Sequence, residues 1–130
     1  MQIYGTMPSL GSIVETCTGA LARVTPQDLS ADTLEGAMSV LKGADVGQAI
    51  DEYLASLPAK PENERDLPDW EALMREKAKE LNRYAHAFNT ELSRIKEMHN
   101  RLNLPQLDEL IRAAQHIIRP LYNFSASLSV

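Results

Sequence analysis

The chain has a single cysteine, few aromatic residues and no long apolar run, and each shortage argues against a class of protein. Cys17 alone cannot form an intramolecular disulfide, and a reduced cytoplasm suits one free thiol best. No stretch approaches the ~20 apolar residues that cross a bilayer, so we expect no membrane span. The first residues, MQIYGTMPSLGS, lack the basic segment and apolar run of a secretory signal. The sequence therefore predicts a cytoplasmic protein, and export without a cleavable signal peptide stays open.

The motifs of common catalytic and cofactor sites are missing too. The glycines are scattered, and no Gly-x-Gly-x-x-Gly or Gly-Lys-Ser/Thr phosphate loop occurs. Cys17 has no neighbouring histidine and falls on the apolar side of its predicted helix, as a buried small hydrophobe would. His86 and His99 share one predicted helix at a distance of ~20 Å, too far apart to bind one metal. We expect no enzyme, no cofactor and no metal site.

Charge is unevenly spread along the chain, whose net charge is −5. Acids dominate from residue 28 to residue 71, whereas bases outnumber acids from residue 72 to residue 119. The two halves could attract each other, within one chain or between two, or the charges could simply cover solvated helix faces. Neither half has the clustered basic patch that nucleic-acid binding requires.

One heptad pattern from Trp70 to Leu102 dominates the sequence. Its first positions are all apolar: Met74, Leu81, Phe88, Ile95 and Leu102. The fourth positions are mixed and include Lys77 and Glu91, which we expect to pair with charges on neighbouring helices. With no Gly or Pro inside, the pattern predicts one helix over residues 66–102, ~50 Å long. Such a helix must bury its stripe against other helices of the chain or form a coiled coil with another chain, and both arrangements stay open.

Start signals predict four shorter helices. Capping boxes begin at Ser12, Asp32 and Asp45, each followed three residues later by Glu or Gln. Residues 58–65 are polar and contain proline, which indicates a loop. Asp66 and Asn103 each stand two residues before a proline, and we expect both side chains to cap the helix that follows.

The last helix is predicted over residues 104–121, where Pro120 should kink or end it. Residues 1–11 and 123–130 are expected to be flexible ends. No alternating β-branched run competes with the helical pattern. The sequence therefore predicts an all-α bundle of about five helices, forming one domain over residues 1–130.

Aromatic residues are the best candidates for binding anchors, and most of them lie at or after Trp70. Tyr84 and Phe88 fall on the apolar stripe, where a core position competes with a binding role. Trp70 begins the long helix, where a neighbouring helix need not reach it. Tyr122 and Phe124 follow Pro120, and we expect them to form an exposed hydrophobic anchor.

Part of the long helix resembles a known family. The stretch Glu80-Leu-Asn-Arg-Tyr84-Ala-His-Ala87, Lys96-Glu-Met98 after it and the proline-bearing loop before it resemble the helical-hairpin needle subunits of type III secretion. This chain is longer, with an extra predicted helix at each end. The resemblance implies a component of a bacterial secretion system or its chaperone.

Two functions are consistent with these patterns. The first is a non-enzymatic helical protein that binds another protein, as an adaptor, chaperone-like partner or assembly subunit, and that could form a homodimer. The second is a small acidic inhibitor that blocks a basic surface on a partner protein. The acids that would form such a face include Asp51, Glu52, Asp66 and Asp69.

Overall fold

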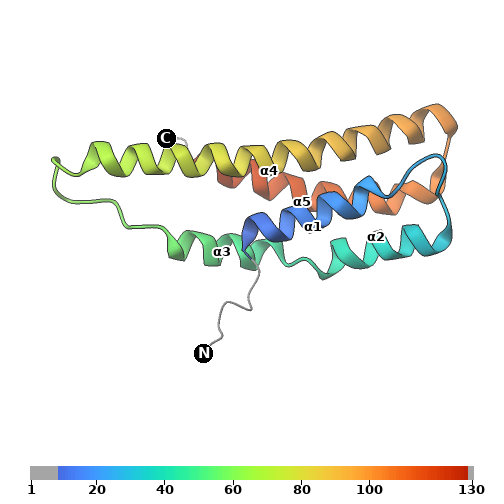
Figure 1. The fold of residues 1–130 in the computed structure, drawn as a ribbon, viewed down its shortest axis with the longest axis horizontal. Helices are drawn as coiled ribbons and strands as arrows, with labels where there is room; N and C mark the ends of the chain where they lie inside the picture. The colour runs from blue at the N-terminus through green and yellow to red at the C-terminus, as the bar shows by residue number, and fades with distance from the viewer. Residues whose placement is uncertain (1–8, 129–130) are drawn as a thin grey trace.

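The protein, described by a computed structural model over residues 9–128, is an all-α bundle, as predicted. In that range five α-helices follow one another, with a short 3-10 turn before the last (Figure 1). They are α1 (Leu10–Ala22), α2 (Ala31–Gly43), α3 (Val46–Ser56), α4 (Leu67–Leu102), the 3-10 turn η2 (Pro105–Leu107) and α5 (Asp108–Leu128). None of the described helices is long and apolar enough to cross a membrane. The predictions for residues 1–8 and 129–130 lie outside the described residues.

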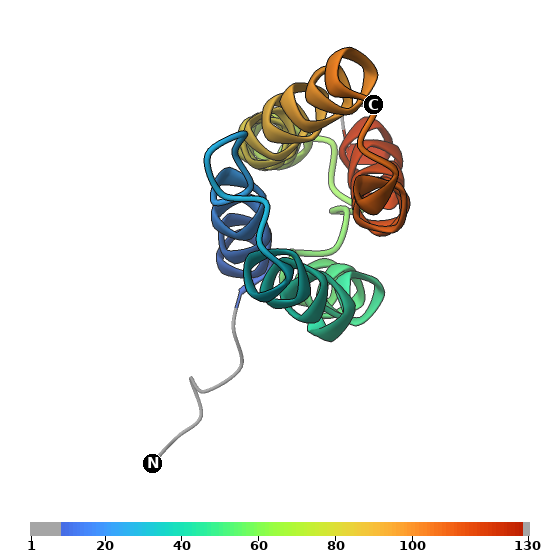
Figure 2. The same ribbon diagram turned by 90° about the vertical axis from the view of Figure 1, so that its right-hand side faces the viewer.

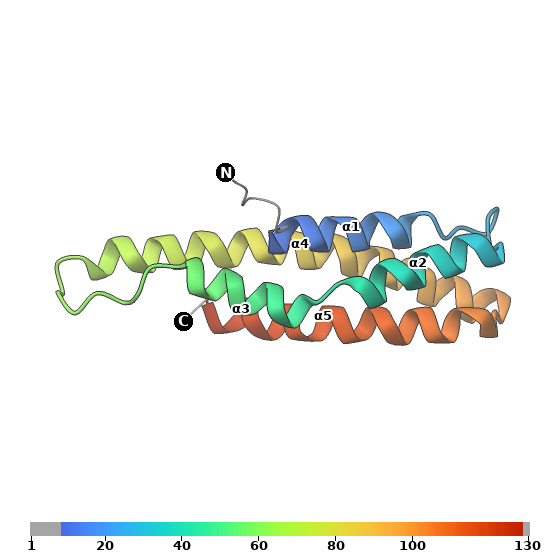
Figure 3. The same cartoon turned by 90° about the horizontal axis from the view of Figure 1, so that it is seen from below.

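The five helices form a bundle with the cross-section of a four-helix bundle, because α2 and α3 lie end to end (Figures 2 and 3). We call each of the four positions in this cross-section a column. α1 packs against α4 on one side and against α2 and α3 on the other. α5 closes the ring by packing against α4 and against α2 and α3. The apolar stripe of α4 is therefore covered by α1 and α5, so the long helix packs within its own chain.

The break between α2 and α3 comes from a local capping interaction. Ala44 has an extended backbone, with ψ of 108°, which ends α2 after Gly43. The Asp45 carboxylate then accepts a hydrogen bond from the backbone N–H of Gln48 at 2.9 Å. The predicted cap at Asp45 is confirmed, and it lets two short helices cover the length of one column.

Three other predicted caps are wrong. α1 is capped by Ser9 rather than Ser12, and α2 is capped by Ser30 rather than Asp32. In both cases a serine just upstream suits the capping position equally well, so the sequence offers two competing starts. Asp66 immediately precedes α4, but its side chain makes no capping hydrogen bond.

The buried face of α4 uses most of the predicted first positions but few of the fourth positions. Met74, Leu81, Phe88 and Ile95 are buried as expected, whereas Leu102 is 49% exposed. The face is completed by Ala78, Ala85 and Leu92, each four residues after a first-position residue. The buried seam of α4, meaning the row of its core-facing residues, therefore combines the first positions with the residues four places after them. The fourth positions lie at the edge of this seam, which explains why charged residues are tolerated there.

Glu91 is one of these charged residues, and the partner predicted for it is wrong. Its carboxylate pairs with Arg94 of the same helix at 2.9 Å, not with a charge on a neighbouring helix. Arg94 Nη2 also donates a hydrogen bond to the Leu21 carbonyl oxygen at 2.9 Å. Leu21 lies in the last turn of α1, and its carbonyl oxygen also accepts the Val24 N–H at 3.1 Å, so Arg94 adds a second hydrogen bond at the end of that helix.

A sharp turn follows α4, as predicted, but Asn103 acts at the end of α4 rather than at the start of the next helix. Asn103 is left-handed, with φ of 53°, and its N–H donates to the His99 carbonyl oxygen at 2.8 Å. Asparagine tolerates this conformation better than most residues. Pro105 then begins η2, and Leu107 is fully buried beneath the turn.

α5 runs through Pro120 to Leu128, so the predicted end at residue 121 and the irregular segment after it are wrong. Proline removes one backbone N–H, but the residues beyond it pack against the bundle. Leu121 and Ser125 are buried, and the Ser125 hydroxyl donates to Asn82 Oδ1 on α4 at 2.8 Å. These contacts hold the last turns in place.

Phe88→Ala tests the buried seam. Phe88 is 0% exposed, so the substitution should lower the free energy of unfolding by about 3–5 kcal/mol in urea denaturation. Leu102→Ala is the matched control, because Leu102 holds the same heptad position but is exposed, and its effect should stay within about 0.5 kcal/mol. A loss below about 1 kcal/mol for Phe88→Ala would contradict the observed register.

Candidate functional site

α4 extends past the other helices at the end where it begins. In Figures 1 and 3 its first turns lie beyond the ends of α1, α3 and α5, accompanied by the loop that joins α3 to α4. A groove of about 470 Å³ lies at this end of the bundle. It is lined by Leu54, Leu57, Pro58, Ala59, Lys60, Trp70, Glu71, Met74, Ser127 and Leu128, and we call it the Trp70 groove.

Trp70 fixes one wall of this groove. Its indole Nε1 donates a hydrogen bond to the Pro58 carbonyl oxygen at 2.9 Å, so the loop is held against α4. The indole is half-buried, and Leu54 on α3 contributes a side chain that is 52% exposed. A concave apolar surface on helical supports, with one tethered aromatic ring, is the usual form of a binding site for an apolar side chain.

The acidic candidates lie around this end on two helices. Asp51 and Glu52 belong to α3, whereas Asp66 and Asp69 flank the start of α4, and all four are exposed. Within residues 9–128 the ion pairs are Arg94–Glu91 and His99–Asp108, so none of these four carboxylates is paired there. All four are therefore unpaired surface charges within residues 9–128.

The structure divides the remaining aromatic candidates between core and surface. Phe88 is in the core, and Tyr84 is half-buried against α1, where its ring leaves no room for a Cβ at Gly11. Phe124 is half-buried and meets the Tyr53 ring edge-on, with centroids 5.9 Å apart, so its predicted exposure is wrong. Tyr122 is 38% exposed, as expected. The predicted Tyr122–Phe124 anchor is therefore reduced to Tyr122.

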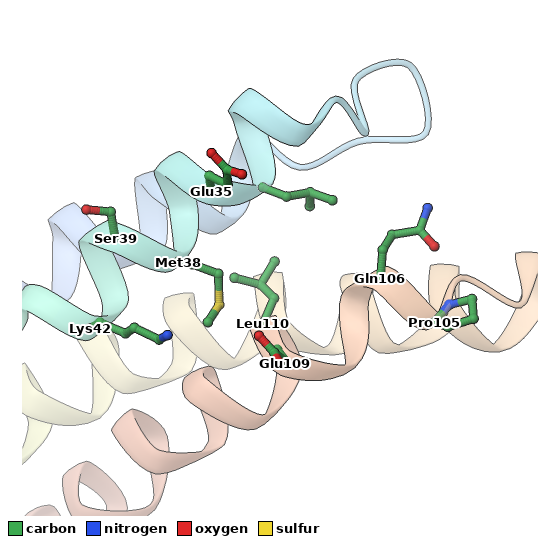
Figure 4. A pocket seen from close by; sticks show the side chains of 9 residues that line it. Glu35, Met38, Ser39, Lys42, Pro105, Gln106, Glu109 and Leu110 are labelled. Carbon is green, nitrogen blue, oxygen red and sulfur yellow. The ribbon is translucent and has the colours of Figure 1, made fainter.

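A second groove, of about 630 Å³, lies between α2 and the start of α5 (Figure 4). Met38 and the buried Leu110 form its floor, with Glu35, Lys42 and Glu109 around them. Its charges are mixed, and its lining contains no cysteine or histidine. Its large apolar side chains are half-buried or buried, whereas Leu54 at the Trp70 groove is 52% exposed.

The described part of the chain offers little reactive chemistry. Burial raises the pKa of the Cys17 thiol to about 11, so the thiol stays protonated and weakly nucleophilic at neutral pH. No group of three or more His, Cys, Asp or Glu side chains within residues 9–128 could hold a metal ion. Burial is the main cause of a raised pKa at Tyr53, and the nearby Glu80 and Tyr84 raise this pKa further. The Tyr53 hydroxyl is buried without a hydrogen-bond partner, and we find no role for it.

No protein-family model, curated protein or solved structure matches this chain. Sequence reasoning selected Trp70 and the neighbouring acids but missed Leu54 and Leu128, which complete the groove. Leu54 has the helical spacing typical of a core residue, and only the relative lengths of the helices leave it accessible. Leu128 lies in the segment 123–130, which the sequence indicates as a flexible end.

At the opposite end of the bundle, His99 of α4 lies within hydrogen-bond distance of Asp108, the first residue of α5. The hydrogen bond that His99 donates to the Asp108 carboxylate raises the pKa of His99, and the charge of Asp108 adds to the effect. Protonated His99 is thus favoured in the folded state. The pair ties the α4–α5 turn together when the histidine is charged.

This pair predicts a pH-dependent stability. Because the pKa of His99 is raised, its contribution is fully present below the unfolded pKa of about 6.5 and is lost as pH rises through the higher folded value. His99→Gln should remove that dependence, so urea denaturation from pH 5.5 to 8.5 should give a flatter curve than wild type. His86→Gln, an exposed change on the same helix, should keep the wild-type slope. Parallel curves for His99→Gln and wild type would contradict the assignment.

Proposed function

We propose that this chain is a non-enzymatic helical protein that docks another protein through the Trp70 groove, as an adaptor, chaperone-like partner or assembly subunit. The observation that carries the proposal is the 52% exposure of Leu54 beside the tethered Trp70, at the end where α4 outreaches its neighbours. Large apolar side chains of this kind, placed in a groove on rigid helices, are typical of interaction sites.

The sequence supports a biological context and a cellular location for this interaction. The resemblance of residues 80–98 to needle subunits supports a bacterial secretion component or its chaperone, and the single thiol supports a cytoplasmic location. A homodimer is one form the interaction could take. The stripe of α4 no longer argues for it, because α1 and α5 cover that stripe. A self-contact would have to use the Trp70 groove or another exposed surface.

An acidic inhibitor is the second candidate function. It is favoured by the exposure of Asp51, Glu52, Asp66 and Asp69, none of which is paired in the described chain. An inhibitor that acts through charge alone would tolerate loss of the apolar groove, because long-range attraction depends on the carboxylates. Substitution of Leu54 therefore separates the two candidates.

Site-directed photo-cross-linking tests the proposed function. A photoreactive residue replaces Leu54 in one variant and Leu102 in the other, and both are expressed in the cells from which the protein comes. Leu102 is the matched control, since it is 49% exposed but lies at the other end of α4. Position 54 should give a discrete adduct that position 102 does not give.

Competition completes this test. Excess purified wild-type protein should abolish the adduct, whereas excess Leu54→Ser protein should not, because serine removes the apolar contact while leaving an exposed position that tolerates it. An adduct of twice the chain's mass would identify the partner as a second copy. Identical adducts from positions 54 and 102, or no adduct at all, would overturn the proposal.

A further inference from the structure

The end of α3 makes the Trp70 groove electronegative. α3 ends at Ser56, and its last turn contributes Leu54 to the lining. That turn contains no basic residue. The free carbonyl groups at a helix C-terminus carry about half a negative elementary charge, which is normally offset by a nearby cation.

Acidic side chains extend this negative potential to the rim. Glu71 lines the groove directly. Asp51 lies three residues before Leu54 on α3, so the two share a helix face. Asp66 lies one helical turn before Trp70, and its carbonyl oxygen accepts a hydrogen bond from the Trp70 backbone N–H at 3.2 Å. All three carboxylates are exposed.

Positive charge at this end of the bundle is outnumbered. Among the lining residues Lys60 balances Glu71, but residues 51–71 hold seven acids against two bases, Lys60 and Arg65. The N-terminus of α4 also contributes a partial positive charge, but Asp69 in its first turn offsets that charge. An apolar groove with a negative rim complements a ligand that has apolar side chains flanked by bases.

The shape of this end favours a helical ligand. The first turns of α4 lack the neighbouring helices that pack on its later turns, because α1 and α5 both stop short of them (Figures 1 and 3). A helix laid against these turns would meet Trp70 and Leu54 with its apolar face, in the manner of amphipathic helices that bind hydrophobic grooves. Its polar face would lie toward the acidic rim and solvent.

We propose that the Trp70 groove binds a cationic amphipathic helix presented by a partner protein. This inference rests on the proposed function and names the partner's chemistry. Apolar side chains of the helix enter the groove between Leu54 and Trp70. Lysine or arginine residues on either side of them contact Glu71, Asp51 and the carbonyl end of α3.

A designed peptide provides the probe, and Trp70 provides the signal, since it is the only tryptophan in the chain. The probe is an 18-residue peptide of leucine and lysine with helical spacing and no aromatic residue. Titration should change Trp70 fluorescence in a saturable way, and the apparent Kd should weaken at least about fivefold between 50 and 300 mM salt. A leucine–glutamate peptide of the same pattern should leave the fluorescence unchanged.

Two matched pairs of variants locate the binding. Glu71→Lys and Glu97→Lys change the net charge equally at exposed positions of α4, but only Glu71 lines the groove. Glu71→Lys should weaken the leucine–lysine peptide about tenfold, and Glu97→Lys by less than about twofold. Leu54→Ser should likewise weaken it, whereas Leu102→Ser should not. Circular dichroism checks that all four variants remain folded.

Three outcomes would overturn this inference. Equal weakening by Glu71→Lys and Glu97→Lys would mean that net charge alone attracts the peptide. Absence of any Trp70 response to the leucine–lysine peptide would mean that the groove does not bind it. Tighter binding of the leucine–glutamate peptide would reverse the sign of the charge. In that last case docking at the groove, and hence the proposed function, would still stand, because cross-linking from position 54 tests it independently.

Discussion

The length of α4 is the constraint on which the rest of this structure depends. Its 36 residues span ~54 Å, whereas α5 has 21 residues and α1 has 13. No other helix of the described chain is as long, and α1 and α5 together cover its apolar stripe. α2 and α3 lie end to end in the column that packs against α1 and α5. The first turns of α4 extend past the other helices, and the loop held by Trp70 accompanies them. The groove is a consequence of this mismatch in length.

The sequence predicted most of the fold because its signals are local. The heptad pattern placed the long helix within one residue of its observed start, and the Asp45 cap formed as expected. The starts of α1 and α2 were missed because two residues that suit the capping position stand within three positions of each other, Ser9 and Ser12 at α1 and Ser30 and Asp32 at α2. The continuation of α5 past Pro120 could not be predicted, since it depends on contacts of Leu121 and Ser125 with distant parts of the chain.

The candidate site was only partly predictable. Trp70 and the surrounding acids stand out by residue type, but whether a leucine such as Leu54 is buried depends on how far its neighbouring helices extend. Phe124 shows the opposite error, because the predicted end of α5 would have exposed a ring that instead packs on Tyr53. The C-terminus of α3 adds to the negative charge of the groove, and its position beside Trp70 becomes visible only once the helices are assembled.

Residue-resolved amide hydrogen exchange along α4 tests the central claim most directly, namely that this helix is supported by the bundle only over part of its length. The account predicts that amides of residues 81–98, which α1 and α5 cover, exchange only through global unfolding. Amides of residues 67–73 should exchange much faster, through local opening of the turns that lack neighbouring helices. Uniform protection along the whole of α4 would contradict it, because the first turns would then be as firmly packed as the centre and no open docking surface would remain there.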